Sequence, residues 1–145
     1  MGAVHKIFLL AFVLYSANGY LKEEDFGEAA TKIAIPLKEM CMEITGASQE
    51  VIDQYKIGHF VENEKAQRYV LCLWRVSGLM DKNLKLNETF LDSILPQKER
   101  DADFPGEVKK CHAVIDQLGD EENYQKIFEF EKCLFKLDSA DFIMF

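Results

Sequence analysis

Four cysteines are the residues of this chain whose type and spacing carry the clearest chemistry. They are separated by thirty, thirty-eight and twenty-one residues, at positions Cys41, Cys72, Cys111 and Cys133. A zinc knuckle needs cysteines roughly two to four residues apart, so these gaps argue against one. Wide gaps are typical of disulfides that join helices in an oxidising compartment. Four cysteines permit three pairings, and the spacing alone does not choose among them.

Side chains that commonly perform catalysis are sparse. Beyond residue 19 the chain holds two histidines, His59 and His112, which we interpret as exposed polar residues. A pH-sensitive contact is the alternative. Neither an HExxH motif nor a GxSxG elbow is present. The sequence from Asp81 to Asn83 begins like a calcium loop, but Leu86 stands where the tight turn needs glycine. We therefore expect no enzyme activity, no metal and no cofactor.

The first nineteen residues are typical of a cleavable secretion signal. Lys6 gives a positive start, an apolar run covers residues 7–14, and small residues precede a cleavage site after Gly19. A membrane-spanning helix needs about 20 apolar residues, so this run is too short to be an anchor. We expect residues 1–19 to be the signal peptide and residues 20–145 to form a soluble, secreted domain.

Acidic residues outnumber basic ones. The chain has 25 Asp and Glu against 17 Lys and Arg, a formal net charge of −8, and removal of Lys6 with the signal would leave −9. Such a surface repels phosphate backbones and anionic lipid head groups, so nucleic-acid binding is not expected. Solubility is our default interpretation of the acid excess. The 126 residues left after cleavage are enough for one domain with its own core.

Apolar residues recur at helical spacing, and they predict an all-α fold of six helices without a strand. The expected helices cover residues 24–40, 49–57, 63–77, 88–95, 105–118 and 121–137. Pro36 should kink or split the first helix. Ser48, Asn87 and Asp120 are the expected N-caps of later helices. Asn87 also begins a glycosylation sequon, an alternative that we rank second. The charged run Gln97–Asp103 is expected to be a solvated loop.

These features resemble the insect odorant-binding proteins of the general and pheromone-binding family, over essentially the whole mature chain. That family has six helices and six cysteines, and the four cysteines here correspond to its first, third, fourth and sixth. The missing second and fifth would fall at Arg68 and Tyr124, as in the four-cysteine, or minus-C, subgroup. Shorter segments are also similar, namely Cys72-Leu73-Trp74, Ser77–Asp81, Lys85–Asn87, Thr45–Ser48 and Cys133-Leu134-Phe135.

The resemblance implies one of the three pairings, Cys41–Cys72 and Cys111–Cys133. The first bridge would join the first and third helices, and the second would join the fifth and sixth. In the family the two missing cysteines pair with each other, so a whole bridge between the third and sixth helices is absent here. We therefore expect easier motion between those two helices.

The resemblance also implies an apolar cavity that carries a small hydrophobic molecule: an odorant, a pheromone, a fatty alcohol or a fatty acid. A membrane receptor is a candidate partner, and the expected state is a monomer or a weak homodimer. The candidate ligand contacts are Val70, Trp74, Leu79, Leu91, Val108, Ile115, Leu134 and Phe142. A packed core position is the alternative for each of them. The tail 142–145 is a candidate lid over the opening, the alternative being a tail packed outside or frayed.

Two other functions are alternatives for a secreted chain with four cysteines. A secreted helical signalling protein would have the same cysteine count and a similar length, but it needs helices of about 20 residues or more. Glycine and proline breaks along this chain predict shorter helices. A small secreted hydrolase would need a nucleophile or a metal set that the sequence does not provide.

Overall fold

The computed structural model describes residues 25–140 and 142–144, which form seven helices and one isolated antiparallel bridge between Met80 and Leu86. The helices are α1 (Gly27–Thr45), α2 (Gln49–Lys56), α3 (Glu64–Val76), α4 (Glu88–Ile94), α5 (Gln97–Asp101), α6 (Phe104–Gln117) and α7 (Asn123–Leu137). The all-helical fold expected from the sequence is confirmed. The expected signal peptide, residues 1–19, lies outside the described residues.

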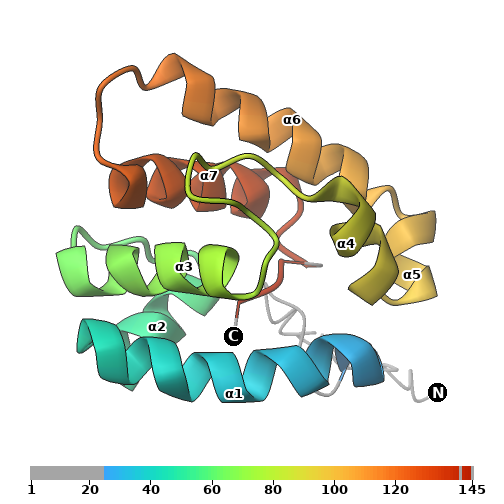
Figure 1. Cartoon of the computed structure of the whole chain (residues 1–145), viewed down its shortest axis with the longest axis horizontal. Coiled ribbons are helices and arrows are strands. Elements are labelled where there is room, and N and C mark those ends of the chain that lie inside the picture. Colours follow the sequence, from blue (N-terminus) through green and yellow to red (C-terminus); the bar gives the residue numbers. More distant parts are fainter. Residues whose placement is uncertain (1–24, 141, 145) are drawn as a thin grey trace, which may run out of the picture.

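Helices α3 and α7 form the centre of the fold. Figure 1 shows α6, α7, α3 and α1 one beneath another, with α4 and α5 at one end. The contacts agree, because α3 packs against both α1 and α7, and α7 also packs against α6. Each central helix buries apolar residues three or four positions apart, such as Ala66, Tyr69 and Leu73 on α3.

Two predicted helix starts are confirmed and one is wrong. The side chains of Ser48 and Asn87 each accept a hydrogen bond from the backbone N–H three residues later. The last helix is capped by Glu122 and not by Asp120. Glu122 and Gln125 form a reciprocal capping box, which satisfies two backbone donors where a single aspartate would satisfy one.

Pro36 does not split α1, which continues from Gly27 to Thr45. The proline removes one backbone hydrogen bond and is exposed on the outer face of the helix. Ala34 and Leu37, on either side of it, are buried in the core. Packing before and after the proline therefore outweighs its local effect. At 19 residues α1 is the longest helix in the described part of the chain.

The charged run after Pro96 is not the solvated loop that its composition suggests. Residues Gln97–Asp101 form α5, in which Glu99 is buried. Nη1 of Arg100 donates to the carbonyl oxygens of Asp92 at 3.0 Å and Leu95 at 2.8 Å. These carbonyls end α4 and would otherwise need another donor. The charged side chains thus have local structural partners, which composition does not reveal.

His112 was interpreted as an exposed polar residue, and this is wrong. It is half-buried on α6, and its Nε2 is hydrogen bonded to the carbonyl oxygen of Leu84 at 2.7 Å. The imidazole therefore holds the loop before α4 against α6. His59 is exposed, as expected.

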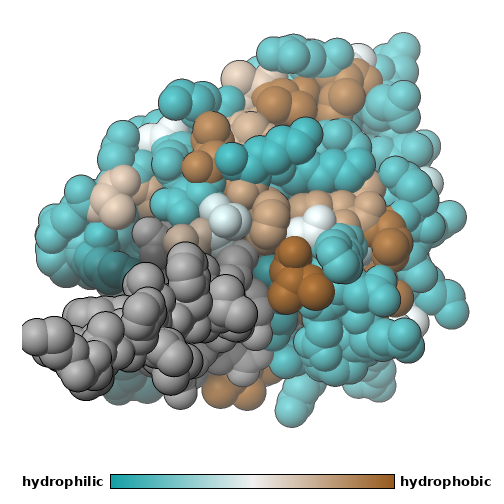
Figure 2. All heavy atoms as spheres, turned by 180° about the vertical axis from the view of Figure 1, so that it is seen from behind, coloured by the Kyte–Doolittle hydropathy of each residue, from teal (hydrophilic) through white to brown (hydrophobic). Residues whose placement is uncertain are grey.

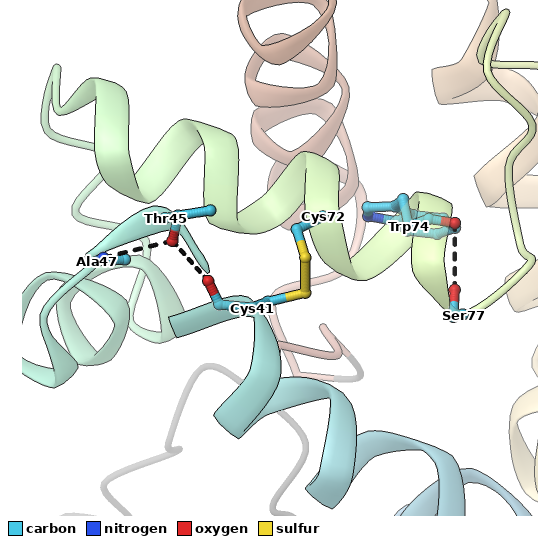
Figure 3. Close-up of a disulfide and its surroundings, with 6 residues drawn as sticks. All are labelled: Cys41, Thr45, Ala47, Cys72, Trp74 and Ser77. Carbon is cyan, nitrogen blue, oxygen red and sulfur yellow. Dashed lines mark hydrogen bonds between the residues drawn. A yellow bond between two sulfur atoms is a disulfide. The ribbon is translucent and has the colours of Figure 1, made fainter. Parts of the chain in front are cut away.

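Two disulfides tie the helices together. Cys41–Cys72 joins α1 to α3 with Cα atoms 5.7 Å apart, and Cys111–Cys133 joins α6 to α7 at 5.5 Å. These are the pairs that the resemblance implies. Figure 3 shows the first bridge beside Thr45, whose hydroxyl donates to the Cys41 carbonyl oxygen at 2.7 Å. This bond helps to hold the last turn of α1 at the crosslink.

Most of the described surface visible in Figure 2 is hydrophilic, with small separate hydrophobic areas. The large apolar side chains that remain exposed are Ile35, Met40, Ile44, Ile57, Val61, Val76 and Leu137. Within the described residues, none of the helices has the length and apolar character required to cross a bilayer. A binding site for an apolar molecule is therefore best sought inside the protein.

Candidate ligand-binding cavity

An apolar cavity with a volume of about 60 Å³ lies among α1, the end of α3, α4, the start of α6 and α7. The residues that line the cavity are Phe26, Ala30, Ile33, Leu37, Leu73, Trp74, Ser77, Leu79, Leu91, Ile94, Leu95, Pro96, Phe104, Glu131, Leu134, Ile143 and Met144.

The structure brings half of the predicted ligand contacts to this cavity. The four that line it are Trp74, Leu79, Leu91 and Leu134. The four that are buried in the core outside this lining are Val70, Val108, Ile115 and Phe142. Periodicity identifies a buried face of a helix but does not separate the part that faces a cavity from the part that packs on a neighbour. Ligand contact itself remains a prediction for all eight.

The C-terminal tail folds back onto the body of the protein. The Phe142 ring packs edge-on against Phe135 and Phe60, with centroids 5.2 Å and 6.2 Å away. Such aromatic pairs stabilise by about 0.5–1.5 kcal/mol each beyond burial. Ile143 and Met144 follow directly and form part of the cavity wall. Phe142 therefore anchors the tail, while the next two residues close one side of the cavity. Phe145 lies outside the described residues.

Trp74 lies on α3 close to the disulfide that joins α3 to α1. Cys72 lies two residues before Trp74, and Ser77, the C-cap of α3, lies three residues after it (Figure 3). The Ser77 hydroxyl donates to the Trp74 carbonyl oxygen at 3.1 Å and accepts from Leu79 N–H at 3.3 Å. The single proton of this hydroxyl is therefore already used by the backbone, and one acceptor lone pair remains.

Glu131 on α7 is the one ionisable side chain of the lining, within the residues that the structure describes. It is 2% exposed, and its Oε1 accepts a hydrogen bond from Nε1 of Trp74. The Trp74 ring also packs edge-on against Phe130, with centroids 5.0 Å apart. Oε2 of Glu131 is buried and has no hydrogen-bond partner in the described part of the chain.

Burial determines the charge of this carboxyl group. Loss of water raises the pKa of Glu131 from its usual 4.5 to about 8, and the hydrogen bond from Trp74 opposes the rise. At neutral pH the group is therefore mainly protonated, and it is neutral inside an apolar wall. This removes most of the penalty of burying a carboxylate.

Glu131 is absent from the contacts predicted from the sequence. The chain has many acids, and none stands out by type alone. The available signal is position, because Glu131 lies four residues after Ile127 and three before Leu134, in the middle of the apolar stripe of α7. An acid in a buried stripe needs a partner or a function.

Comparison with known proteins agrees with this geometry. Residues 23–137 match the PBP/GOBP family. Among solved structures, odorant binding protein 5 of Apis mellifera is similar, with a TM-score of 0.62 and 19% sequence identity over 86% of this chain and 98% of that chain. No curated protein sequence gives a significant match. The family match covers most of the chain, and the chain therefore belongs to the PBP/GOBP family.

Proposed function

We propose that this protein is a secreted carrier that holds a small hydrophobic molecule in the cavity and releases it chemically unchanged. The observation that carries the proposal is the apolar cavity, lined by five helices and the C-terminal tail in a PBP/GOBP fold. Secretion is supported by the signal-like residues 1–19 and by two disulfides, which persist in oxidising compartments. The solved relative is named as an odorant-binding protein, and an odorant is our proposed cargo.

The apolar contribution to binding would by itself limit the affinity to about the micromolar range. A ligand that buries ten methylene groups gains about 8 kcal/mol, at roughly 0.8 kcal/mol for each group. Association takes back several kcal/mol in lost translational and rotational freedom. The remainder corresponds to a dissociation constant weaker than micromolar, so micromolar binding also needs a polar contact in the cavity. Reversible binding of this strength suits a carrier that must release its cargo.

A matched pair of substitutions on α1 tests the site. Ala30 lines the cavity and is buried, whereas the preceding residue, Ala29, is exposed. Ala30→Leu fills part of the cavity and should weaken binding of the fluorescent apolar probe N-phenyl-1-naphthylamine by about tenfold or more. Ala29→Leu makes the same chemical change outside the cavity and should bind the probe like the wild type.

The probe measurements show whether the ligand binds in the cavity and whether the protein is a carrier. Equal affinity of both variants would place the probe elsewhere on the protein. If no volatile or lipid displaces the probe from the wild type, the carrier proposal fails. Native mass spectrometry of protein purified from its source would identify a co-purified ligand directly.

A further inference from the structure

One residue of the cavity lining has a buried side-chain oxygen that makes no hydrogen bond within the described residues. This atom is Oε2 of Glu131, on a side chain that is 2% exposed. The Oε1 atom is already paired with Trp74, and this pairing fixes the orientation of the carboxyl plane. A buried polar atom without a partner is unfavourable, so a ligand group that pairs with it would be bound selectively.

We infer that Glu131 is the polar anchor of the cavity and that it selects ligands ending in a hydroxyl group, such as a straight-chain primary alcohol. The inference rests on the carrier function proposed above and names the chemical class of the cargo. The apolar wall would hold the hydrocarbon chain, and Oε2 would pair with the hydroxyl at its end. One hydroxyl matches one free oxygen.

A hydroxyl group suits Oε2 in both protonation states. It donates to the carboxylate, and it accepts from the protonated acid. An ether, ester or aldehyde only accepts, so it pairs with the protonated acid alone. A hydrocarbon leaves Oε2 without a partner.

Charged ligand groups fit less well. An ammonium group brings three N–H donors, whereas the lining side chains offer only Oε2 of Glu131 and the one remaining acceptor lone pair of the Ser77 hydroxyl. At least one donor would therefore be left without a side-chain partner. A carboxylate would bring a negative charge beside an acid, in a chain whose net charge is −8. The neutral hydroxyl avoids both penalties.

A competition assay with ligands of equal length tests the inference. The full chain with both disulfides is loaded with N-phenyl-1-naphthylamine and titrated with 1-octanol, 1-methoxyheptane, nonane or octylamine. At pH 9, above the pKa of Glu131, Oε2 is an acceptor only. The alcohol should then displace the probe at about tenfold lower concentration than the ether, since one hydrogen bond differs between them.

Two variants on α7 provide the contrast. Glu131→Gln keeps the shape and the bond from Trp74, but its amide N–H₂ donates equally to an alcohol or an ether, so the tenfold preference should fall to about one. Glu129→Gln is the control, because Glu129 pairs with Lys132 at 2.6 Å and is not in the cavity lining. It should keep the preference. Circular dichroism confirms that each variant is folded.

A second measurement needs no variant. At pH 5 the protonated Glu131 also donates to the ether, so the preference of the wild type should shrink. The inference is overturned if the wild type shows no preference at pH 9, if Glu131→Gln retains it, or if octylamine displaces the probe better than octanol. If none of the four ligands displaces the probe, the carrier function itself fails, which is a separate result.

Discussion

The guanidinium carbon of Arg68 on α3 lies 4.3 Å from the centre of the Tyr124 ring on α7. These are the two positions at which the resemblance to the family predicts the missing cysteine pair. A cation–π contact therefore occupies the place of a disulfide between the two central helices. The Arg68 side chain is half-exposed and also pairs with Glu64 at 2.7 Å, so solvent screens the contact. It can break and form again, which a covalent bridge cannot do under oxidising conditions.

Restoring the bridge should slow ligand exchange. In Arg68→Cys with Tyr124→Cys, a disulfide would close a long loop and stabilise the fold by about 3–4 kcal/mol in the chain-entropy model. If opening of the cavity requires α3 and α7 to separate, release of the fluorescent probe in stopped-flow experiments should be several-fold slower. The control is the double serine variant, which lacks both the contact and the bridge. If the bridge forms but release of the probe is not slowed, the cavity opens without separation of α3 and α7.

Glu131 should make stability depend on pH. Its pKa is about 8 in the folded protein and near 4.5 when exposed, so the native state holds a proton that the unfolded chain releases. Stability is therefore full below about pH 4.5 and falls as pH rises towards about 8, by at most about 1.4 kcal/mol per pH unit. Urea unfolding of Glu131→Gln, compared with the wild type at several pH values, isolates this term. The difference in the free energy of unfolding should grow in favour of the variant between about pH 4.5 and pH 8. A constant difference would contradict the raised pKa of Glu131.

Trp74 should report the ionisation of Glu131. It is the single tryptophan of the chain, and its indole N–H donates to the carboxyl group. Deprotonation places a negative charge beside the indole, so tryptophan fluorescence should titrate with a midpoint at about pH 8. The signal should be flat over this range in Glu131→Gln. A titration that persists in the variant would have another source.

Gly58 should not tolerate a side chain. Its φ is +82°, and a Cβ atom would lie 2.3 Å from Cε1 of Phe135 in the aromatic cluster that holds the tail. Gly58→Ala should destabilise by roughly 2–4 kcal/mol, from both backbone strain and overpacking. Gly119→Ala is the matched control, with a φ of +54° and open space around its Cβ, so it should lose only about 1 kcal/mol. If Gly58→Ala and Gly119→Ala lose the same stability in thermal unfolding, Phe135 must have moved and relieved the clash.

The sequence predicted the helical class, the N-caps at Ser48 and Asn87, and four of the residues that line the cavity, because these depend on local chemistry and periodicity. It did not predict α5, whose bonds join Arg100 to carbonyls five and eight residues away. Nor did it identify Glu131, whose role depends on Trp74, 57 positions away in the chain. Partners brought together only by folding leave little trace in a single sequence.

The cavity wall also has a consequence for how the chain is held together. Phe26 lies before the first helix and Met144 in the C-terminal tail, yet both line the same cavity. The two disulfides span only 31 and 22 positions, so neither links these distant segments. A bound molecule would touch both and act as a reversible, non-covalent cross-link between the two ends of the described chain. Ligand binding would then stabilise the fold, because the bound molecule connects Phe26 to Met144 and so closes a long loop that neither disulfide closes.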